Sequence, residues 1–494
     1  MASKDIKESY PKRKKIGFLP TGPIAMIAGT GLLLVEAVFA LLLFKLDLLP
    51  VKYLIPVIVT LVLIFVGAIL LLSGARRSAR RLVGFIVSVA VMCVLLLGSS
   101  YLFSTYAAFD SISDIAKSYD IYNVVVLDSS ECENAGDLEG KTVYTIKSDK
   151  KTYLEAQGNL KGKATVEYKQ VDDAMAAGEK LVERNGSIHD ETILVSRANY
   201  QLYCEDIYGF KEKTRVLCRI KIEAEDSNPG DIDVTRDSFN VYISGIDVWG
   251  NINERVSRSD VNMIATVNPK TRQVLLTSIP RDAYVELHSS GQLDKLTHSG
   301  VYGIDETTGT VEDWLGIDMN YYVRANFDMI IKLVNAVDGV DVYSKYDFKS
   351  AISEYEYHKG WNHLKGRAAL YFARERKSFE DNDQERIKNQ QKVVKAVLKK
   401  MTSSTVILTS YTDILDAVKK NMQTDMSSKE ISSLVKMQLD DMASWDIEKI
   451  SLDGTGDSRP CYLAGGGYAS VIIPDKASID AARAEMAKVF SGKK

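Results

Sequence analysis

The sequence predicts an α/β protein that three N-terminal transmembrane helices anchor and that carries two α/β domains outside the membrane. Three long apolar runs occupy the first 105 of the 494 residues. The remainder alternates short strand patterns with amphipathic helical patterns. A polar, turn-rich segment, residues 223–237, divides that remainder in two. We therefore expect a cytoplasmic tail (1–16), three membrane spans (17–105), an accessory domain (106–231) and a larger domain (232–494).

The three apolar runs cover about residues 18–46, 54–73 and 82–103. Each approaches or exceeds the roughly 20 residues that cross a hydrocarbon core. The first run is too long, and is followed by too many further apolar residues, for a cleaved signal peptide. The sequence therefore predicts three helices that remain in the membrane.

The positions of the basic residues predict the orientation of these helices. Lysine and arginine close to the ends of a span are retained in the cytoplasm. Four basic residues, 12–15, precede the first run, and four arginines lie between the second and third: Arg76, Arg77, Arg80 and Arg81. We expect a multi-pass protein of the plasma membrane with a cytoplasmic N-terminus and with everything after about Tyr106 outside the cell.

Composition excludes several classes of function. The chain has 62 basic and 65 acidic residues and a net charge of -3, so no global field draws it to nucleic acid. The five histidines have no metal-site spacing, and no nucleophile elbow is present, which argues against a zinc or serine hydrolase. Any binding of anions must therefore be local.

The accessory domain is predicted to be a small α/β unit. Residues 123–127, 141–146 and 192–195 have strand patterns, and 174–184 has the pattern of an amphipathic helix. The stretch 137–146 is similar to part of a solute-binding protein. A packing domain and a ligand receptor are both open for this unit, and the first is favoured.

The larger domain mixes strands and helices over about 250 residues, which is typical of a sheet with helices on its faces. The glycine triplet 465–467 lacks the spacing of a nucleotide-binding loop and is predicted to be a turn between two strands. Strands are expected at 239–243, 262–267, 273–278, 450–453 and 469–473, and helices at 311–315 and 329–337.

Charged residues stand at the ends of these strands. Asp247 follows the first strand, Asp260 precedes the second, and Arg281 and Asp282 end the third, with Lys295 shortly after. Carboxylates without histidine or thiolate suit a hard cation that also binds substrate phosphate oxygens. Asp247 and Asp260 are therefore the candidate ligands for Mg²⁺, or Mn²⁺ in its place.

A second group of basic residues comes later in the chain. Arg374 and Arg376 end an apolar segment, and Arg386 and Gln390 lie in the first turns of a predicted helix, 383–401. Several guanidinium groups directed at one point suit a pyrophosphate, because each donates two parallel hydrogen bonds to phosphate oxygens. Together with a metal ion they would stabilise charge on a leaving phosphate.

The helix 383–401 predicts what else the ligand contains. Arg386 and Gln390 are four residues apart and share a face with Val393, Val394, Val397 and Met401. Free amide groups at the start of a helix also favour phosphate. This pattern predicts a ligand with an anionic head and an apolar tail.

Other interpretations compete for each residue taken alone. A single arginine is more often a surface cation, and Asp383 fits a helix cap equally well. An amphipathic helix more often faces a core than a lipid. Only the whole set argues for a site.

Six motifs occur in order from about Asp237 to Ser403: Gly245-Ile246-Asp247, Arg258-Ser259-Asp260, Ser278-Ile279-Pro280-Arg281-Asp282, Lys295 to Gly303, Ala369-Leu370-Tyr371 leading to Arg374 and Arg376, and Asp383-Gln384-Glu385-Arg386 leading to Gln390-Gln391. In this order and spacing the region resembles the catalytic domain of LytR-CpsA-Psr proteins. The three spans and the accessory domain resemble the capsule-associated members of that family.

The resemblance implies an α/β/α layered fold with a mixed central sheet and a hydrophobic pocket for a polyprenyl chain. It implies a phosphotransferase that moves a glycopolymer, such as capsular polysaccharide or teichoic acid, from a polyprenyl-pyrophosphate carrier to peptidoglycan with the help of magnesium. The partners it implies are the lipid carrier, the lipid-linked glycan, peptidoglycan and the membrane, without nucleic acid.

The resemblance also assigns roles to residues. It places the metal-linked aspartates at Asp247 and Asp260, catalytic groups at Arg281, Asp282, Arg374 and Arg376, and substrate-binding groups at Arg258, Lys295, Arg386 and Gln390. Asp282 or a metal-bound aspartate would be the base. The chain departs from the family at Val248 and Trp249, where an arginine is frequent, and at Asn335, Asp338 and Asn389. These departures bear on the identity of the substrate.

Two alternatives to the transferase remain open. One is a non-catalytic membrane regulator that binds the lipid-linked polymer, although only a short tail and a small loop would be cytoplasmic. The other is a pyrophosphatase that uses the same site. Dependence on an acceptor separates transfer from hydrolysis.

Overall fold

The computed structural model describes residues 22–73, 78–114, 119–146, 151–171, 174–182, 192–223, 232–252, 257–380, 383–402 and 410–492. The chain divides into two compact units, Met1–Tyr106 and Ala107–Lys494. The predicted cytoplasmic tail, part of the arginine-rich loop (Arg76 and Arg77) and most of the predicted linker lie outside the described residues.

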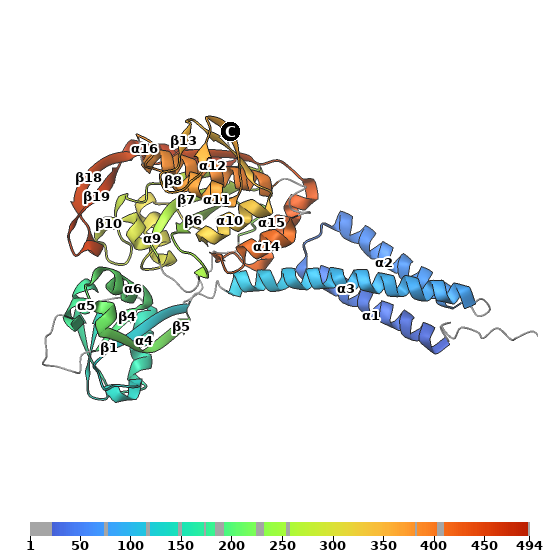
Figure 1. Cartoon of the computed structure of the whole chain (residues 1–494), viewed down its shortest axis with the longest axis horizontal. Coiled ribbons are helices and arrows are strands. Elements are labelled where there is room, and N and C mark those ends of the chain that lie inside the picture. The colour runs from blue at the N-terminus through green and yellow to red at the C-terminus, as the bar shows by residue number, and fades with distance from the viewer. Residues whose placement is uncertain are drawn as a thin grey trace, which may run out of the picture. The chain divides into compact units, whose positions relative to one another are not determined.

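The three predicted apolar runs are helices. They are α1 (Gly22–Leu46), α2 (Val51–Leu72) and α3 (Ser78–Asp114), the last of which is longer than the run that predicted it (Figure 1). All three are long and apolar enough to cross a membrane. Large apolar side chains such as Met26, Leu41 and Leu63 are exposed on them, as expected for helices that face lipid.

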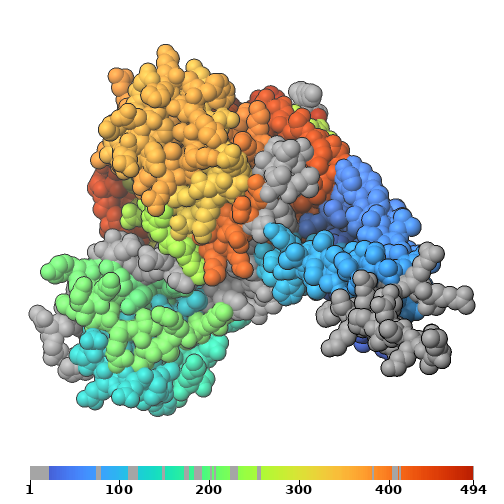
Figure 2. All heavy atoms as spheres, turned by 45° about the vertical axis from the view of Figure 1, so that its right-hand side comes forward, coloured from blue at the N-terminus to red at the C-terminus, as the bar shows by residue number. Residues whose placement is uncertain are grey.

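The accessory region is the small α/β unit that the sequence predicted. Its sheet has the order β3-β2-β4-β1-β5, in which β2 is parallel to β3 and β4 while β1 is antiparallel to β4 and β5 (Figure 1). Figure 2 shows the atoms of this region, coloured cyan to green, side by side. The strands are β1 (Tyr119–Leu127), β2 (Thr142–Ile146), β3 (Glu167–Val171), β4 (Thr192–Ser196) and β5 (Thr214–Glu223); the helices are α4 (Lys151–Lys161), α5 (Ala174–Val182), α6 (Arg197–Asp206) and α7 (Phe210–Lys213).

The larger region is built on a mixed six-stranded sheet, as expected. The strand order is β16-β11-β6-β7-β8-β17; β6 is parallel to β11 and β8 to β17, and the other pairs are antiparallel. The strands are β6 (Phe239–Ile246), β7 (Ser259–Asn268), β8 (Gln273–Ile279), β11 (Tyr321–Ala325), β16 (Met422–Thr424) and β17 (Asp446–Ser451).

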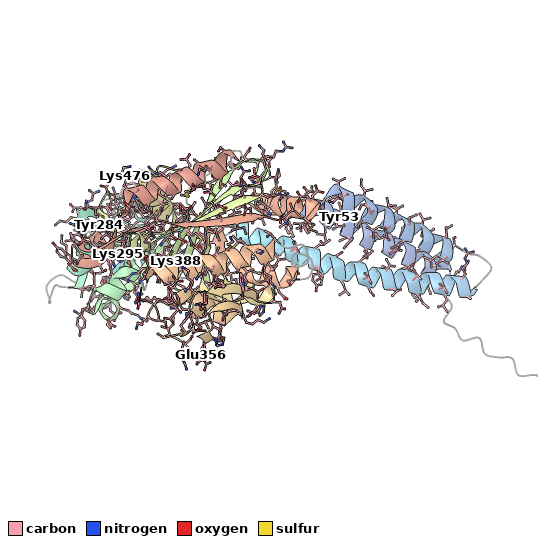
Figure 3. The ribbon with its side chains drawn as sticks, turned by 90° about the horizontal axis from the view of Figure 1, so that it is seen from above. Tyr53, Tyr284, Lys295, Glu356, Lys388 and Lys476 are labelled. Carbon is pink, nitrogen blue, oxygen red and sulfur yellow. The ribbon has the colours of Figure 1, made fainter. Side chains whose placement is uncertain are left out.

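Helices cover both faces of this sheet, which confirms the α/β/α layering. On one face α9 (Ile304–Leu315) and α16 (Lys476–Ser491) pack on buried side chains that include Tyr242 and Ile264. On the other face α12 (Asp383–Met401) and α15 (Ser428–Asp441) cover Val241 and Met263. Figure 3 shows α16, marked by Lys476, and α12, marked by Lys388, on opposite sides of the sheet. The remaining longer helices, α10 (Phe327–Ala336), α11 (Gly366–Arg374) and α14 (Tyr411–Val418), share a hydrophobic core with α12.

Small ribbons lie outside the main sheet. They pair β9 (Tyr284–Glu286) with β10 (Leu293–Lys295), β12 (Val340–Ser344) with β15 (Gly360–Leu364), β13 (Phe348–Lys349) with β14 (Glu356–Tyr357), and β18 (Gly454–Pro460) with β19 (Tyr468–Pro474). The short helix α8 (Leu296–Ser299) follows β10 directly.

One prediction about this region was wrong. The strand that pairs with β19 across the glycine turn is β18, whereas Ile450 belongs to the end of β17 in the main sheet. The sequence of β18, GTGDSRP, is exposed and has no apolar alternation, so its pairing left no signal in the pattern.

Candidate functional site

A cavity of about 400 Å³ opens where β6, β7 and β11 meet helices α10, α11 and α12. Most of its wall is apolar, while several charged groups gather in one part of it. A mostly apolar pocket with a few convergent polar groups is the usual form of a ligand site. The apolar lining includes Ile243, Val261, Ala325, Phe327, Ile330, Ile352, Leu370, Ala373, Val393 and Val394, and the polar lining includes Asp247, Asp260, Arg281, Arg374, Arg376, Lys377, Arg386 and Gln390.

Backbone geometry at the end of β6 sets the position of Asp247. An added Cβ on Gly245 would lie 2.7 Å from the Cβ of Val261 on the neighbouring strand, so this close approach requires glycine. The register of β6 against β7 shifts between Gly245 and Ile246, and such a bulge redirects the side chains that follow it. Asp247 comes directly after this irregularity and lines the cavity.

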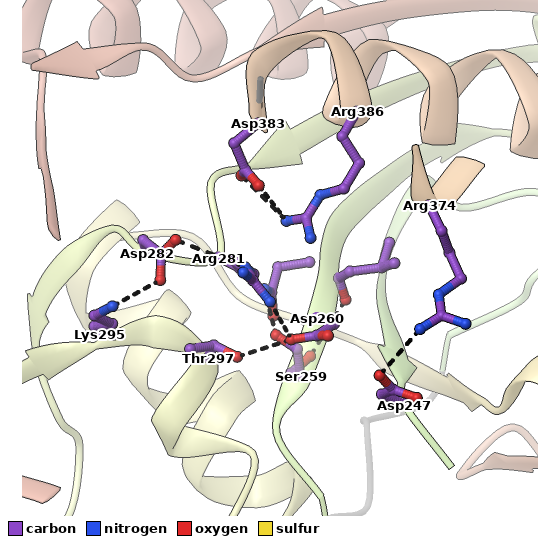
Figure 4. A network of polar contacts seen from close by, with 12 residues as sticks. Asp247, Ser259, Asp260, Arg281, Asp282, Lys295, Thr297, Arg374, Asp383 and Arg386 are labelled. Atoms are coloured by element: carbon purple, nitrogen blue, oxygen red, sulfur yellow. Dashed lines mark hydrogen bonds and ion pairs between the residues drawn. The ribbon is translucent and has the colours of Figure 1, made fainter. Parts of the chain in front are cut away.

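Asp260 holds the guanidinium of Arg281. The Arg281 Nη1 donates to Asp260 Oδ1 at 2.9 Å, and the Thr297 hydroxyl donates to the same oxygen at 3.4 Å (Figure 4). The amide of Thr297 also donates to the carbonyl of Arg281, which fixes the turn after β8 to the start of α8. Burial disfavours the charge of Arg281, but Asp260 and Asp282 outweigh it and raise the pKa of the guanidinium.

Arg374, the last residue of α11, reaches the same place from another element. Its Nη2 lies 3.4 Å from Asp247 Oδ2, and its guanidinium stands 4.2 Å from the centre of the Phe327 ring. Burial raises the pKa of Asp247; Arg374 opposes this, and the charge of Asp260 adds to it. The two aspartates are therefore close enough to interact electrostatically.

Arg386 reaches toward this group from the first turns of α12. Its Nη2 donates a hydrogen bond to Oδ2 of Asp383 at 3.1 Å, and only 8% of the Arg386 side chain is exposed. Burial lowers the pKa of Arg386, and Arg281 adds to that effect. Within the described part of the chain, Nε of Arg281 and Nε of Arg386 are buried without a hydrogen-bond partner. Both guanidinium groups are thus desolvated, and each keeps an unpaired N–H group. A bound anion would stabilise this arrangement.

Glu375 fixes the end of α11, because it lies between Arg374, the last residue of the helix, and Arg376 in the loop that follows. Its carboxylate is fully buried and accepts hydrogen bonds from Ser350, Ala351, Ser378 and the amide of Arg376. Burial favours protonation, but these bonds outweigh it and hold the pKa of Glu375 below its ordinary value. Sequence reasoning gave Glu375 no role, because a glutamate between two arginines resembles a surface charge until its burial is known.

The residues present fit a divalent metal ion that the substrate helps to bind. No group of three or more His, Cys, Asp or Glu side chains among the described residues could hold a metal alone. Asp247 and Asp260 nevertheless line one cavity and interact with each other. Mg²⁺ commonly binds through one or two carboxylates and completes its shell with substrate phosphates and water.

The structure brings together Asp247, Asp260, Arg281, Arg374, Arg376, Arg386 and Gln390 as lining residues of one cavity. Asp282 and Lys295 stand beside it instead: Lys295 Nζ is 3.1 Å from Asp282 Oδ1, and Asp282 Oδ2 is 3.6 Å from Nε of Arg281 (Figure 4). Arg258 precedes β7 and is not among the described residues that line the cavity.

The apolar face predicted on α12 divides between the cavity and the core. Val393 and Val394 line the cavity, whereas Val397 is buried in the hydrophobic core and Met401 packs against that core. Sequence reasoning missed the apolar wall that other elements supply, including Phe327 and Ile352. These residues are far apart in the chain, so no local pattern joins them.

The sequence matches the model of the LytR_cpsA_psr family over residues 208–488, which is more than half of the chain. The chain belongs to this family. A Bacillus anthracis protein named polyisoprenyl-teichoic acid–peptidoglycan teichoic acid transferase TagU is 32% identical over 282 residues, covering 56% of this chain and 89% of that protein. A Bacillus mycoides protein of the same name is 34% identical over 241 residues, 49% of this chain and 75% of that protein.

Solved structures are also similar to about half of this LytR-CpsA-Psr chain. TagT bound to LIIa-WTA is 28% identical and covers 53% of this chain and 94% of that chain, with a TM-score of 0.43. A protein from Streptococcus agalactiae is 30% identical and covers 52% and 89%, with a TM-score of 0.44.

Proposed function

We propose that this LytR-CpsA-Psr protein transfers a glycopolymer from a polyprenyl-pyrophosphate carrier to peptidoglycan by phosphotransfer. One observation carries the proposal: four arginines and two aspartates line a cavity whose wall is otherwise mostly apolar. Figure 4 shows three of these arginines, Arg281, Arg374 and Arg386, with the two aspartates. Relatives that are about a third identical over roughly half of the chain are named teichoic acid transferases, which supports a polymer of the teichoic acid type.

The two parts of the cavity suit the two parts of such a carrier. Arg281, Arg374 and Arg386, with Arg376 and Gln390, would donate hydrogen bonds to the diphosphate. The apolar wall, from Ile243 to Val394, would take the first part of the polyprenyl chain and keep water away from it. Lys295 would act indirectly, through its ion pair with Asp282. Arg258 would bind substrate from outside the cavity.

In the reaction a peptidoglycan hydroxyl attacks the phosphorus that carries the glycan. A new oxygen–phosphorus bond forms, the bond to the second phosphate breaks, and polyprenyl phosphate leaves. Arg281, Arg374 and Arg386 would stabilise the negative charge that develops on the leaving phosphate. A carboxylate of the site, Asp282 or one of the metal-binding aspartates, would take the proton of the hydroxyl. Asp247 and Asp260 would hold Mg²⁺ or Mn²⁺, which supplies Lewis-acid stabilisation of phosphate oxygens when bound.

The proposed substrates set the location of the protein. Three apolar helices, α1 to α3, would anchor it in the plasma membrane. The basic residues next to these helices favour a cytoplasmic N-terminus, so that the catalytic domain stands outside the cell with peptidoglycan and the outward-facing lipid carrier.

A transfer assay with the full-length protein tests this function. The protein is given a labelled lipid-linked glycopolymer with and without peptidoglycan. We expect labelled peptidoglycan and free polyprenyl phosphate only when the acceptor is present, and loss of both products in Arg374→Ala. Phosphate release at the same rate without acceptor would identify a pyrophosphatase, and tight binding without turnover would identify a regulator.

A further inference from the structure

A second cavity, of about 740 Å³, lies on the other side of α12 from the candidate site. We call it the lysine groove. It is bounded by α12, by the β12–β15 ribbon and by β17, the edge strand of the main sheet. In Figure 3, Lys388 marks the helix that separates the two cavities. Five lysines line the groove: Lys392, Lys395, Lys399, Lys400 and Lys449.

Helical geometry puts this groove and the candidate site on different faces of one helix. Successive residues of an α-helix are about 100° apart, so Lys392, Lys395 and Lys399 form one stripe. Arg386 and Gln390 form another stripe, which faces the first cavity. Ala396, the one apolar residue of α12 that lines the groove, has a small side chain that leaves space between the lysines.

The charge of the groove is strongly positive. Among the described residues that line it, Asp341 is the only acid, and its carboxylate already lies 2.8 Å from Nδ1 of His363. Glu385 lies outside the lining and pairs with Lys392 at 3.1 Å, so the excess positive charge comes from the other lysines. The pKa of Lys449 is lowered by partial burial and then by the charges of Lys392 and Lys395. Like charges held this close raise the energy of the empty groove, and a bound anion would remove that cost.

The ribbon adds two exposed aromatic rings to this positive surface. Tyr343 and Trp361 stand directly opposite each other on β12 and β15, with ring centres 5.7 Å apart. Trp361 is 75% exposed and Tyr343 45%, although a ring of either type is normally at least partly buried. Exposed aromatic rings beside a groove indicate a surface that a partner covers.

We propose that the lysine groove binds an anionic polysaccharide, whose phosphate or carboxylate groups pair with the lysines and whose sugar rings pack on Trp361 and Tyr343. The groove is concave and extends to Lys392, whose side chain is only 14% exposed and is paired with Glu385, so a thin chain enters the groove where a flat lipid surface does not. The proposal rests on the function above in one respect: the polysaccharide would be part of the polymer that is transferred, held at a distance from its diphosphate.

Binding of a labelled phosphomannan oligosaccharide to the full-length protein in neutral nanodiscs, measured by fluorescence anisotropy, tests the proposal. We expect Lys395→Gln/Lys399→Gln to bind about tenfold more weakly, since each ion pair contributes on the order of 1 kcal/mol or less. Trp361→Ala should weaken binding about threefold, because it removes one stacking surface. Lys476→Gln/Lys488→Gln on α16 makes the same change of charge elsewhere and should bind as the wild type does.

Competitors identify the class of ligand. Unlabelled phosphomannan should displace the probe, and neutral dextran should not. An oligothymidylate and phosphatidylglycerol vesicles should each displace it less than unlabelled phosphomannan does. Equal affinity of the wild type and the double lysine variant would overturn the proposal. Stronger displacement by the nucleic acid or the vesicles would also overturn it, in favour of that partner.

The outcome can be separated from that of the proposed function. Arg374→Ala should keep its affinity for the free oligosaccharide and lose transfer. Should the wild type bind the oligosaccharide through the lysines yet catalyse no transfer, the groove stands and the proposed function fails. If transfer proceeds while the lysine variants bind the oligosaccharide normally, the proposed function stands and the proposal for the groove fails.

Discussion

The two cavities on either side of α12 hold cations in different ways. In the candidate site three of the four lining arginines are paired with a carboxylate: Arg281 with Asp260, Arg374 with Asp247 and Arg386 with Asp383. In the lysine groove five lysines share one lining aspartate, and Lys392 is paired with Glu385, which lies outside the lining. Fixed, planar guanidinium groups suit a diphosphate whose position must be exact for chemistry, whereas mobile ammonium groups suit a repeating anion whose position can vary. One helix therefore presents the candidate reaction site on one face and the proposed retention site on the other.

The largest effect is expected at the centre of the candidate site. Arg281→Ala should lower the rate of transfer about a hundredfold or more, because removing one preorganised donor to a developing oxyanion typically has that effect. Arg236→Ala, which removes an exposed arginine paired with Asp233, is the matched control and should transfer normally. An Arg281→Ala protein with wild-type rates would place the chemistry elsewhere.

Glu375 tests whether the arginine loop is held by a buried charge. Glu375→Gln should lower the free energy of unfolding by about 3 kcal/mol at neutral pH, because several buried donors lose a charged acceptor. The pKa of Glu375 is held below its ordinary value, so its stabilisation is present above that ordinary value and is lost as the pH falls through the lowered pKa. The difference between the two proteins in chemical denaturation should therefore shrink in acid. A constant difference across pH would contradict this origin.

Asp425 provides a comparison outside both cavities. Burial raises its pKa to about 7, with smaller contributions from Asp305 and Glu430, and it accepts the amide of Tyr322 at 2.8 Å. A raised pKa means that its stabilisation is complete below the ordinary pKa of aspartate and is lost as the pH rises through about 7. Asp425→Asn should raise the free energy of unfolding by roughly 2 kcal/mol at pH 8, and far less at pH 5, because the amide stays neutral. Thermal unfolding at the two pH values checks this, and a benefit that is equal at both would contradict it.

The smallest expected effect is the difference between the two cavities in how strongly salt weakens ligand binding. Exposed charges are screened within about a Debye length, whereas buried pairs are screened much less. Oligosaccharide binding in the lysine groove should weaken steadily as sodium chloride is added, while lipid that co-purifies in the apolar cavity should be retained. Equal sensitivity of both ligands to salt would remove the distinction between the cavities.

The sequence predicted most of the fold because its elements leave local patterns. The apolar runs became α1 to α3, and the strands β6, β7 and β8 fall where alternation and apolar runs predicted them. The strand β18 was missed because it is exposed and polar, and its pairing depends on β19 rather than on its own composition. Such pairing is a property of two segments, and a single window of sequence does not contain it.

The candidate site was predictable where residues follow strand ends or share a helix face. Asp247, Asp260 and Arg281 lie at strand ends, and Arg386 and Gln390 share a face of α12. The role of Glu375 depends on its burial and on hydrogen bonds from Ser350 and Ala351, which are distant in the chain. The lysine groove similarly needs Trp361 from β15 and Lys449 from β17 beside α12. A helical wheel of α12 reveals its lysine stripe, but only tertiary structure joins it to the aromatic pair.

The proposed function requires that the cluster of arginines holds a diphosphate at an apolar cavity. Mass spectrometry of the lipids that co-purify with the full-length protein tests it most directly, with Arg374→Ala and Arg376→Ala as variants and Lys476→Gln as the control. We expect polyprenyl phosphate or pyrophosphate with the wild type and the control, and little with either arginine variant. Equal amounts of polyprenyl lipid in all four proteins, or none in the wild type, would contradict the account.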